Sequence, residues 1–162
     1  MIDRATEDQI KWLVDQAEIQ KLISAYTNCL DDRDFSAWQD LFADEGGYGA
    51  PPNRLAKHLL AKGSEELLSS YEKTHHFLGL PAIAIDGDEA RARCPGITHH
   101  VTVQAHPSQS RTVGGWLRFT FRRTESGWRI VDAFPEVAWT EGEDYFAGAT
   151  RIVEHLASAQ RG

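Results

Sequence analysis

The sequence predicts an α+β fold in which helices pack on one face of a strongly curved, antiparallel or mixed β-sheet and enclose a pocket. The first observation is that apolar residues recur at helical spacing through the first third of the chain. The second is that, from residue 75 onward, segments rich in β-forming residues follow one another with turn signals between them. Helices first and strands afterwards indicate a cone whose mouth is a natural pocket.

The length and composition are those of one domain with its own core. The chain has 162 residues, of which 41% are hydrophobic and 25% charged, so we expect a single domain over residues 1–162. The net charge of −7 argues against nucleic-acid and membrane partners, because both bind basic surfaces. The two cysteines lack a CxxC spacing, the N-terminus is polar, and no apolar run would span a bilayer, so we expect a cytoplasmic protein.

The N-terminal third is predicted to be helical. Thr6, with Gln9 three residues later, resembles a capping box. Two stripes of apolar residues at helical spacing follow, and they do not lie on one continuous helix face. This indicates a short lead-in helix that bends into a longer one. The stripes are Ile10, Leu13, Val14 and Ala17, followed by Ile19, Leu22, Ile23, Tyr26 and Leu30. Asp34 is the expected N-cap of a second helix that ends before Gly46 and carries Phe35, Trp38, Leu41 and Phe42.

The rest of the chain is predicted to hold two short helices, four strands and a closing helix. Pro51-Pro52 breaks the chain, after which Leu55, Leu59 and Leu60 suggest one helix and Gly63-Ser64 the start of another. Strands are predicted over 77–85, 90–104, 112–123 and 128–139, with turns at Asp86-Gly87-Asp88 and Glu125-Ser126-Gly127 between them. A last helix is expected around Tyr145, Phe146, Ile152, Val153 and Leu156.

Three side chains far apart in the sequence can together hold, move and return a proton: Asp31, His76 and His100. The histidines stand in two adjacent pairs, and neighbouring strand residues point to opposite faces, so at most one of each pair faces a pocket. Tyr26 precedes Asp31 by five residues, which places the two about 140° apart on an ideal helix. They converge only if Asp31 lies at the end of the helix.

Each of these residues also has a purely structural interpretation. Asp31 can be a solvated carboxylate at a helix end, a strand histidine can be a surface or satisfied core residue, and Tyr48 can polarise a carbonyl or simply pack. Two histidines and a carboxylate also make the ligand set of a non-haem iron site, but no HxH or HxxxH spacing supports it, so no metal is expected. Four aromatic residues are expected in the core, with one or two of them lining the pocket and binding substrate: Trp116, Phe119, Phe134 and Trp139.

Several motifs resemble those of a known superfamily. The string from Tyr26 through Leu30-Asp31-Asp32-Arg33-Asp34-Phe35 to Asp44 is similar to the first-helix signature of the SnoaL-like branch of the NTF2-like superfamily. The hairpin Ile85-Asp86-Gly87-Asp88-Glu89-Ala90 and the segment Gly127-Trp128-Arg129-Ile130 resemble later strands of that branch. The resemblance covers residues 10–140, and it implies the NTF2-like cone and a trimer, with dimers common elsewhere in the superfamily.

Within the superfamily the pattern is most similar to that of the scytalone dehydratases. The resemblance implies that Asp31, His76 and His100 are catalytic and that neither metal nor cofactor takes part. Leu117 stands where that family has a substrate-binding asparagine, and only Tyr48 lies near the position of one of its two tyrosines. Tyr26 is instead spaced from Asp31 as in the bile-acid dehydratases. The identity of the substrate therefore does not carry over.

The sequence thus predicts a cofactor-independent dehydratase for a small cyclic hydroxy-ketone or a related polyketide-, terpenoid- or steroid-like compound. His76 would take the proton, Asp31 would orient His76, and His100 would act as general acid while Tyr48 or Tyr26 polarises the carbonyl. The alternatives are an isomerase or cyclase with the same residues, or a non-catalytic small-molecule or protein-binding module. An exposed aromatic face on a curved sheet predicts a homo-oligomer, a trimer or a dimer.

Overall fold

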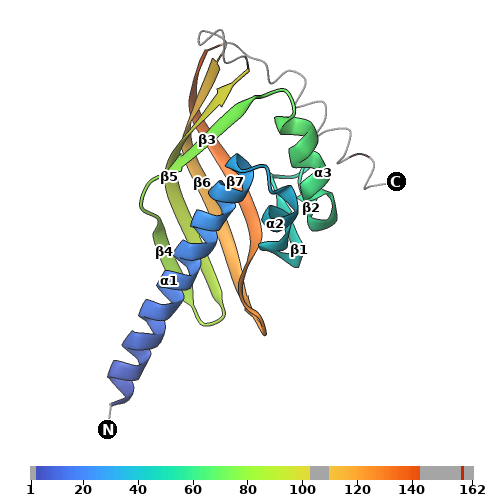
Figure 1. The fold of residues 1–162 in the computed structure, drawn as a ribbon. Coiled ribbons are helices and arrows are strands. Elements are labelled where there is room, and N and C mark those ends of the chain that lie inside the picture. The colour runs from blue at the N-terminus through green and yellow to red at the C-terminus, as the bar shows by residue number, and fades with distance from the viewer. Residues whose placement is uncertain (1–2, 103–109, 143–157, 159–162) are drawn as a thin grey trace.

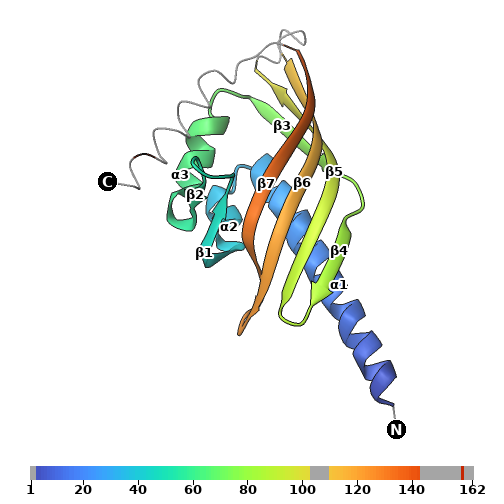
Figure 2. The same ribbon diagram turned by 180° about the vertical axis from the view of Figure 1, so that it is seen from behind.

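The predicted α+β architecture is confirmed. The computed structural model describes residues 3–102, 110–142 and 158, so the predicted closing helix around Tyr145 and Leu156 lies outside the described residues. Within them, three helices pack on one face of a seven-stranded sheet (Figure 1). Figure 2 shows the opposite face of that sheet, over which no helix of the described residues passes. None of the helices in these ranges is long and apolar enough to cross a membrane.

Helix α1 (Arg4–Asp31) is continuous, where a lead-in helix and a longer one were predicted. Its N-cap is Asp3, whose side chain accepts a hydrogen bond from the backbone N–H of Thr6 at 2.8 Å, so Thr6 is not the cap. The second apolar stripe packs in the core, whereas Ile10, Leu13 and Val14 of the first are about half exposed. The apolar residues change from one helix face to another because the N-terminal end of α1 extends past the sheet, where it has no core to face (Figures 1 and 2).

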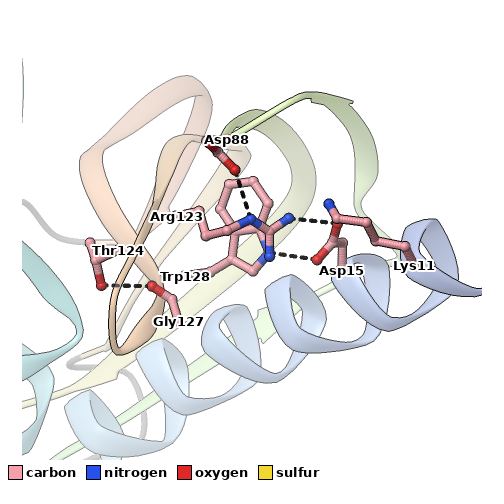
Figure 3. Close-up of polar contacts among 7 residues, drawn as sticks. All are labelled: Lys11, Asp15, Asp88, Arg123, Thr124, Gly127 and Trp128. Carbon is pink, nitrogen blue, oxygen red and sulfur yellow. Dashed lines mark hydrogen bonds and ion pairs between the residues drawn. The ribbon is translucent and has the colours of Figure 1, made fainter. Parts of the chain in front are cut away.

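A buried carboxylate holds α1 to the hairpin between β6 (Ser110–Thr124) and β7 (Gly127–Gly142). Asp15 accepts hydrogen bonds from Arg123 at 2.6 Å, from the Trp128 indole at 3.2 Å and from Lys11 at 3.1 Å (Figure 3). Arg123 also lies over the Trp128 ring and donates to Asp88 at 2.9 Å. The hydrogen bond from Arg123 outweighs the effect of burial and lowers the pKa of Asp15 to about 2. Asp15 is therefore an ionised anchor for the helix.

Between α1 and the sheet strands, the chain forms two shorter helices and a small strand pair. Asp34 caps α2 (Phe35–Asp40) by accepting from the backbone N–H of Ala37 at 3.0 Å, as predicted, but α2 ends sooner than expected. The residues that follow it form β1 (Phe42–Tyr48), which pairs with β2 (Leu55–Ala56). Gly47 permits that close pairing, because a Cβ there would lie 2.5 Å from the Leu55 carbonyl oxygen. Helix α3 (Lys57–Leu68) runs through Gly63 as one helix, where two were predicted.

The strands follow the order β2-β1-β7-β6-β5-β3, and β4 pairs with β5 beside that path. The single strand predicted over 77–85 is two strands, β3 (Lys73–Leu78) and β4 (Ala82–Asp86), which pair with different halves of β5 (Glu89–Val101). The contact of β1 with β7 is parallel, whereas the other pairings are antiparallel. The sheet is thus mixed, as expected.

The core lies between the helices and the inner face of the sheet. On that face, small residues of β5 stand opposite large residues of β6: Ala90 opposite Phe121, Ala92 opposite Phe119 and Cys94 opposite Leu117. Burying each phenylalanine stabilises the fold by about 1.5–3 kcal/mol. Farther along the same two strands, Gly96, Thr98, Val113 and Gly115 line an open volume instead of filling it. The sequence of β5 and β6 therefore places core at one end of the sheet and a cavity toward the other.

Candidate active site

A cavity of about 400 Å³ lies against the inner face of the sheet. Volumes of this size are typical of pockets that bind small molecules. The lining comes from all three helices and from β1, β3, β5, β6 and β7, and it is mainly apolar and aromatic. Among the described lining residues, those with ionisable side chains are Tyr26, Tyr48, His76, His100, Arg111 and Glu136. The carboxylate of Glu136 itself lies beside Arg93 and Arg118 on the outer face of the sheet.

His76 and Asp31 form a hydrogen-bonded pair at the edge of this cavity. His76 lines the cavity from β3, and its Nδ1 lies 2.7 Å from Oδ1 of Asp31. Asp31 also accepts hydrogen bonds from the backbone N–H of His76 at 2.8 Å and from the Thr74 hydroxyl at 3.0 Å. Burial raises the pKa of Asp31, but these hydrogen bonds and the charge of His76 outweigh it, so the pKa lies below its usual value. Asp31 is therefore an ionised acceptor.

The position of Asp31 follows from where α1 ends. Asp31 is the last residue of the helix, and the backbone leaves the helical path at Arg33, whose φ is 63°. The helix end lies beside β3, which is the edge strand of the sheet, so the carboxylate reaches the backbone N–H of His76 as well as its ring. Tyr26 and Asp31 thus reach one site even though an ideal helix would separate them.

His100 occupies the neighbouring position on β5. His76 pairs with Thr98 in the sheet register, and Thr74 pairs with His100, so the two imidazoles are diagonal neighbours. Their ring centroids lie 6.1 Å apart and both rings line the cavity. Burial, followed by the nearby charge of His76, lowers the pKa of His100 to about 4. His100 is therefore neutral near pH 7.

The second histidine of each pair lies on the outer side of the sheet. His75 and His99 are partners in the register, and the side chain of His75 is 76% exposed. His99 Nδ1 lies 3.0 Å from the Thr112 hydroxyl oxygen. The alternation of strand residues thus places His76 and His100, and not their neighbours, on the cavity lining. His75 Nδ1 nevertheless lies 3.8 Å from Oδ2 of Asp31 at the edge of the sheet.

Two tyrosines add phenol groups to the cavity lining. Tyr26 lies edge-on to Trp38 and Phe119, with ring centroids 5.4 and 5.2 Å apart, and Tyr48 lies 5.9 Å from Trp38. Burial and the neighbouring Tyr48 raise the pKa of Tyr26 well above its ordinary value, and burial raises the pKa of Tyr48 to about 12. Both phenols therefore keep their protons near pH 7 and can serve as hydrogen-bond donors.

The predicted substrate-binding residues are divided between three places. Leu117 lines the cavity with its buried side chain, whereas Trp116 belongs to the lining although its ring is 36% exposed and lies against the outer-face Arg93. Phe119 is almost fully buried in the core and is absent from the cavity lining. Phe134 and Trp139 are 37% and 46% exposed and also lie outside the lining, so their expected position in the core or pocket needs correction. The reason is strand register, because Phe134 pairs with the exposed Arg118 and the ring of Trp139 lies over Gly114 on the outer face.

Two residues of the site were not expected from the sequence. Thr74 bonds Asp31, and its alternation with His76 along β3 would have placed it on the same face. Arg111 lines the cavity, and it alternates with Val113 and Leu117 along β6. A charged residue at a strand position that faces the inside of the fold is the signal that could have identified it. Among the described residues, no group of three His, Cys, Asp or Glu side chains is arranged to hold a metal ion.

Comparison with known proteins places the chain among proteins of one family. Residues 12–133 match the family described as the SnoaL-like domain. An uncharacterized protein of Mycobacterium tuberculosis is 29% identical over 123 residues, which cover 72% of this chain and 81% of that protein. A Mycobacterium bovis protein, also uncharacterized, matches with the same values.

Solved structures share the fold over most of its length. A candidate scytalone dehydratase from Novosphingobium aromaticivorans superposes with a TM-score of 0.72 at 18% identity, over 81% of this chain and 89% of that one. A hexachlorocyclohexane dehydrochlorinase superposes with a TM-score of 0.74 at 13% identity, over 85% and 94% of the two chains. An NTF2-like protein from Salmonella enterica superposes with a TM-score of 0.68 at 21% identity, over 82% and 96%. At these identities the likeness shows the NTF2-like fold.

Proposed function

Because the chain belongs to the SnoaL-like family of the NTF2-like superfamily, we propose that its cavity is the active site of a cofactor-independent dehydratase. The observation that carries the proposal is the 2.7 Å contact between His76 Nδ1 and Asp31 beside a mainly apolar cavity. The substrate class is a small cyclic hydroxy-ketone or a related polyketide-, terpenoid- or steroid-like compound. Two proteins of the same fold are named for eliminations, one as a candidate dehydratase and one as a dehydrochlorinase, which supports this reaction class.

His76 is the proposed general base. An ionised Asp31 can only accept hydrogen bonds, so Nδ1 of His76 carries its proton and Nε2 keeps a lone pair. Nε2 takes the proton from the carbon next to the substrate carbonyl, and the pair of electrons left on that carbon forms the new double bond as the C–O bond breaks. Asp31 stabilises the imidazolium that results.

The leaving hydroxide takes its proton from the same imidazolium. His100, with a pKa of about 4, is neutral near pH 7 and is a poor proton donor, so we assign it a hydrogen bond to the departing oxygen instead of the general-acid role expected from the sequence. The proton that His76 removed from carbon then returns to the oxygen, water leaves, and His76 is ready for another cycle. Tyr26 and Tyr48, both protonated, are the proposed donors to the carbonyl oxygen on which negative charge develops.

An elimination assay tests the proposal. Cyclic ketones with a hydroxyl group β to the carbonyl are incubated with the protein, and the conjugated enone is followed by its ultraviolet absorbance. We expect His76→Gln to lower the rate by at least about 10²-fold, because the general base is lost. His58→Gln, at an exposed position of α3, is the matched control and keeps the wild-type rate. Wild-type rates equal to those in buffer, or unchanged in His76→Gln, would contradict the proposal, and double-bond migration without loss of water would favour an isomerase.

A further inference from the structure

The cavity has an uneven distribution of charge. Of the described residues that line it, Arg111 and Glu136 are the basic and the acidic residue. Glu136 accepts two hydrogen bonds from Arg118, at 2.8 and 3.1 Å, and its carboxylate lies 3.6 Å from Arg93. Those two arginines alternate with the buried residues of β5 and β6, so the carboxylate of Glu136 that they hold lies on the outer face of the sheet. Arg111 is thus the lining residue, among those described, that gives the cavity a positive charge.

Arg111 is placed beside the proposed catalytic histidines. It is the register partner of His100 across β5 and β6, and it belongs to the inner phase of β6 with Val113 and Leu117. Its side chain is partly buried and its Nε atom is shielded from solvent. In such surroundings an arginine binds a carboxylate more strongly than it would in open water. Its positive charge is also one cause of the low pKa of His100, which agrees with Arg111 lying close to that ring.

From this placement we infer that Arg111 binds an anionic oxygen group of the ligand, a carboxylate in the simplest case, and that the cavity selects acidic compounds. A guanidinium has five N–H donors in a planar fork, so Arg111 can hold a carboxylate beside the contacts that it already makes. With the anionic group at Arg111, the apolar body of the ligand lies along the aromatic lining and its reactive part reaches His100 and His76. The inference rests on the proposed function for the identity of the site, and it names the class of substrate.

A pair of ligands that differ only in charge tests this inference. Naphthalene-1-acetate and naphthalene-1-acetamide have nearly the same shape, and their binding is measured by isothermal titration calorimetry. We expect wild-type protein to bind the acetate at least about tenfold more tightly than the amide, which corresponds to about 1.4 kcal/mol. In Arg111→Gln this preference disappears while the affinity for the amide is kept, which shows that the variant is folded. Arg111→Lys keeps part of the preference, because it retains the charge without the planar fork.

A control variant and the possible outcomes distinguish a failure of this inference from a failure of the proposed function. Arg118→Gln removes the same charge from the outer face and keeps the preference for the acetate. Equal affinity of the wild type for the two ligands, failure to bind the acetate at millimolar concentration, or a preference that survives in Arg111→Gln would each overturn the inference. Elimination from neutral hydroxy-ketones with no preference for the acetate would leave the proposed function standing and the inference refuted. The reverse pattern, acetate preference without elimination, would contradict the proposed function alone.

Discussion

The residue on which the proposed chemistry depends most is Asp31, since its carboxylate determines which nitrogen of His76 carries the proton. Oδ1 accepts from His76 Nδ1 at 2.7 Å while Oδ2 accepts from the backbone N–H of the same residue at 2.8 Å. Both oxygens of the carboxylate thus bond His76, while Thr74 donates to Oδ1 at 3.0 Å and His75 Nδ1 lies 3.8 Å from Oδ2. Asp32, one residue later, is exposed and has no such partner among the described residues.

Asp31→Asn should abolish most of the activity without unfolding the protein. The amide nitrogen can donate to Nδ1, which places the imidazole proton on Nε2 and removes the base from the cavity. We expect the rate of elimination to fall by about 10²–10⁴-fold. The measurement is the rate of enone formation together with the tautomer of His76 from nitrogen-15 NMR. Asp32→Asn is the matched control, and an Asp31→Asn variant with wild-type rate or an unchanged tautomer would show that Asp31 does not orient the base.

His100 should make the stability of the protein depend on pH. Burial depresses its pKa from 6.5 to about 4, so the unfolded chain binds a proton between these two pH values and the folded chain does not. The stability that neutral His100 contributes is complete above pH 6.5 and is lost as the pH falls toward 4. The loss amounts to about 3 kcal/mol.

Urea unfolding at pH 7, 5.5 and 4 measures this contribution. The free energy of unfolding of the wild-type protein should fall over that pH range. The free energy of unfolding of His100→Gln should fall by less, and the difference should be about the 3 kcal/mol assigned to His100. His58→Gln, which changes an exposed histidine, should retain the wild-type dependence. A decline of the same size in His100→Gln would mean that His100 is not held neutral in the folded protein.

Among the elements of the fold, α1 depends on a single buried anchor for its N-terminal half. Asp15 is 3% exposed and is bonded by Arg123, Trp128 and Lys11, so one carboxylate joins the helix to the β6–β7 hairpin (Figure 3). Beyond it, Ile10, Leu13 and Val14 contribute little burial. The position of α1 on the sheet, and with it the position of Asp31 at the far end, thus rests partly on this contact.

Asp15→Asn should destabilise the protein by about 3 kcal/mol at pH 7, because it leaves Arg123 without its buried counter-charge. The pKa of Asp15 is lowered from 3.8 to about 2, so its contribution is present above pH 3.8 and is lost as the pH falls toward 2. The difference between wild type and variant in urea unfolding should shrink over that range. Asp8→Asn, at an exposed position of the same helix, should stay within about 0.5 kcal/mol of wild type. A similar small effect for Asp15→Asn would refute the anchoring role.

Much of the fold could be predicted because its elements have strong local signals. The cap at Asp34, the helical stripe from Ile19 to Leu30 and the turns between the later strands are each written in a few neighbouring residues. Phe42–Tyr48 was predicted in part as helix because Phe42 continues the spacing of Trp38. Its strand conformation depends on parallel pairing with β7, which lies more than eighty residues later. No local pattern reports such a contact.

The candidate site also contains some residues that the sequence could place and others that it could not. Alternation along a strand was enough to select His76 and His100 from their pairs, because both strands are regular. Phe134 and Trp139 could not be placed, because the register of β6 against β7 shifts twice, between Thr120 and Phe121 and between Gly114 and Gly115. A register shift changes which residues face inward and depends on the partner strand. Arg111 was missed because an arginine at an inner strand position is understood only once a cavity is known to lie there.

One face of the sheet is covered by helices, and no helix of the described residues passes over the other face (Figure 2). Apolar side chains gather on that open face. This outer patch consists of Phe77, Ile97, Trp116, Phe134 and Trp139, each at least 36% exposed. Phe77 pairs with Ile97, Ile97 with Gly114, and Gly114 with Trp139, so the patch crosses four strands. Arg93, Arg118 and Glu136 stand beside it and pair with one another. An exposed apolar patch with polar residues at its rim is typical of an interface, and we propose that a second copy of the chain covers it.

Self-association through the outer patch is therefore expected, as a trimer or a dimer. Ile97→Glu places a charge in the middle of the patch and should shift the protein to monomer in sedimentation-velocity experiments. Gln20→Glu adds the same charge on α1 and should leave the assembly intact. A wild-type protein that is monomeric at 100 µM, or an Ile97→Glu variant that assembles like wild type, would show that this face does not mediate association.

Proton exchange at carbon reports directly whether His76 and Asp31 act as a proton-transfer pair. Wild-type protein and His76→Gln are each incubated with 1-tetralone in deuterated buffer, and loss of the signal from the hydrogens next to the carbonyl is followed by proton NMR. This reports the removal of the proton by the base without requiring a leaving group. We expect exchange at least about 10²-fold faster with wild type than with His76→Gln. Exchange no faster than in buffer, or equally fast with the variant, would contradict the assignment of His76 and Asp31 as the proton-transfer pair.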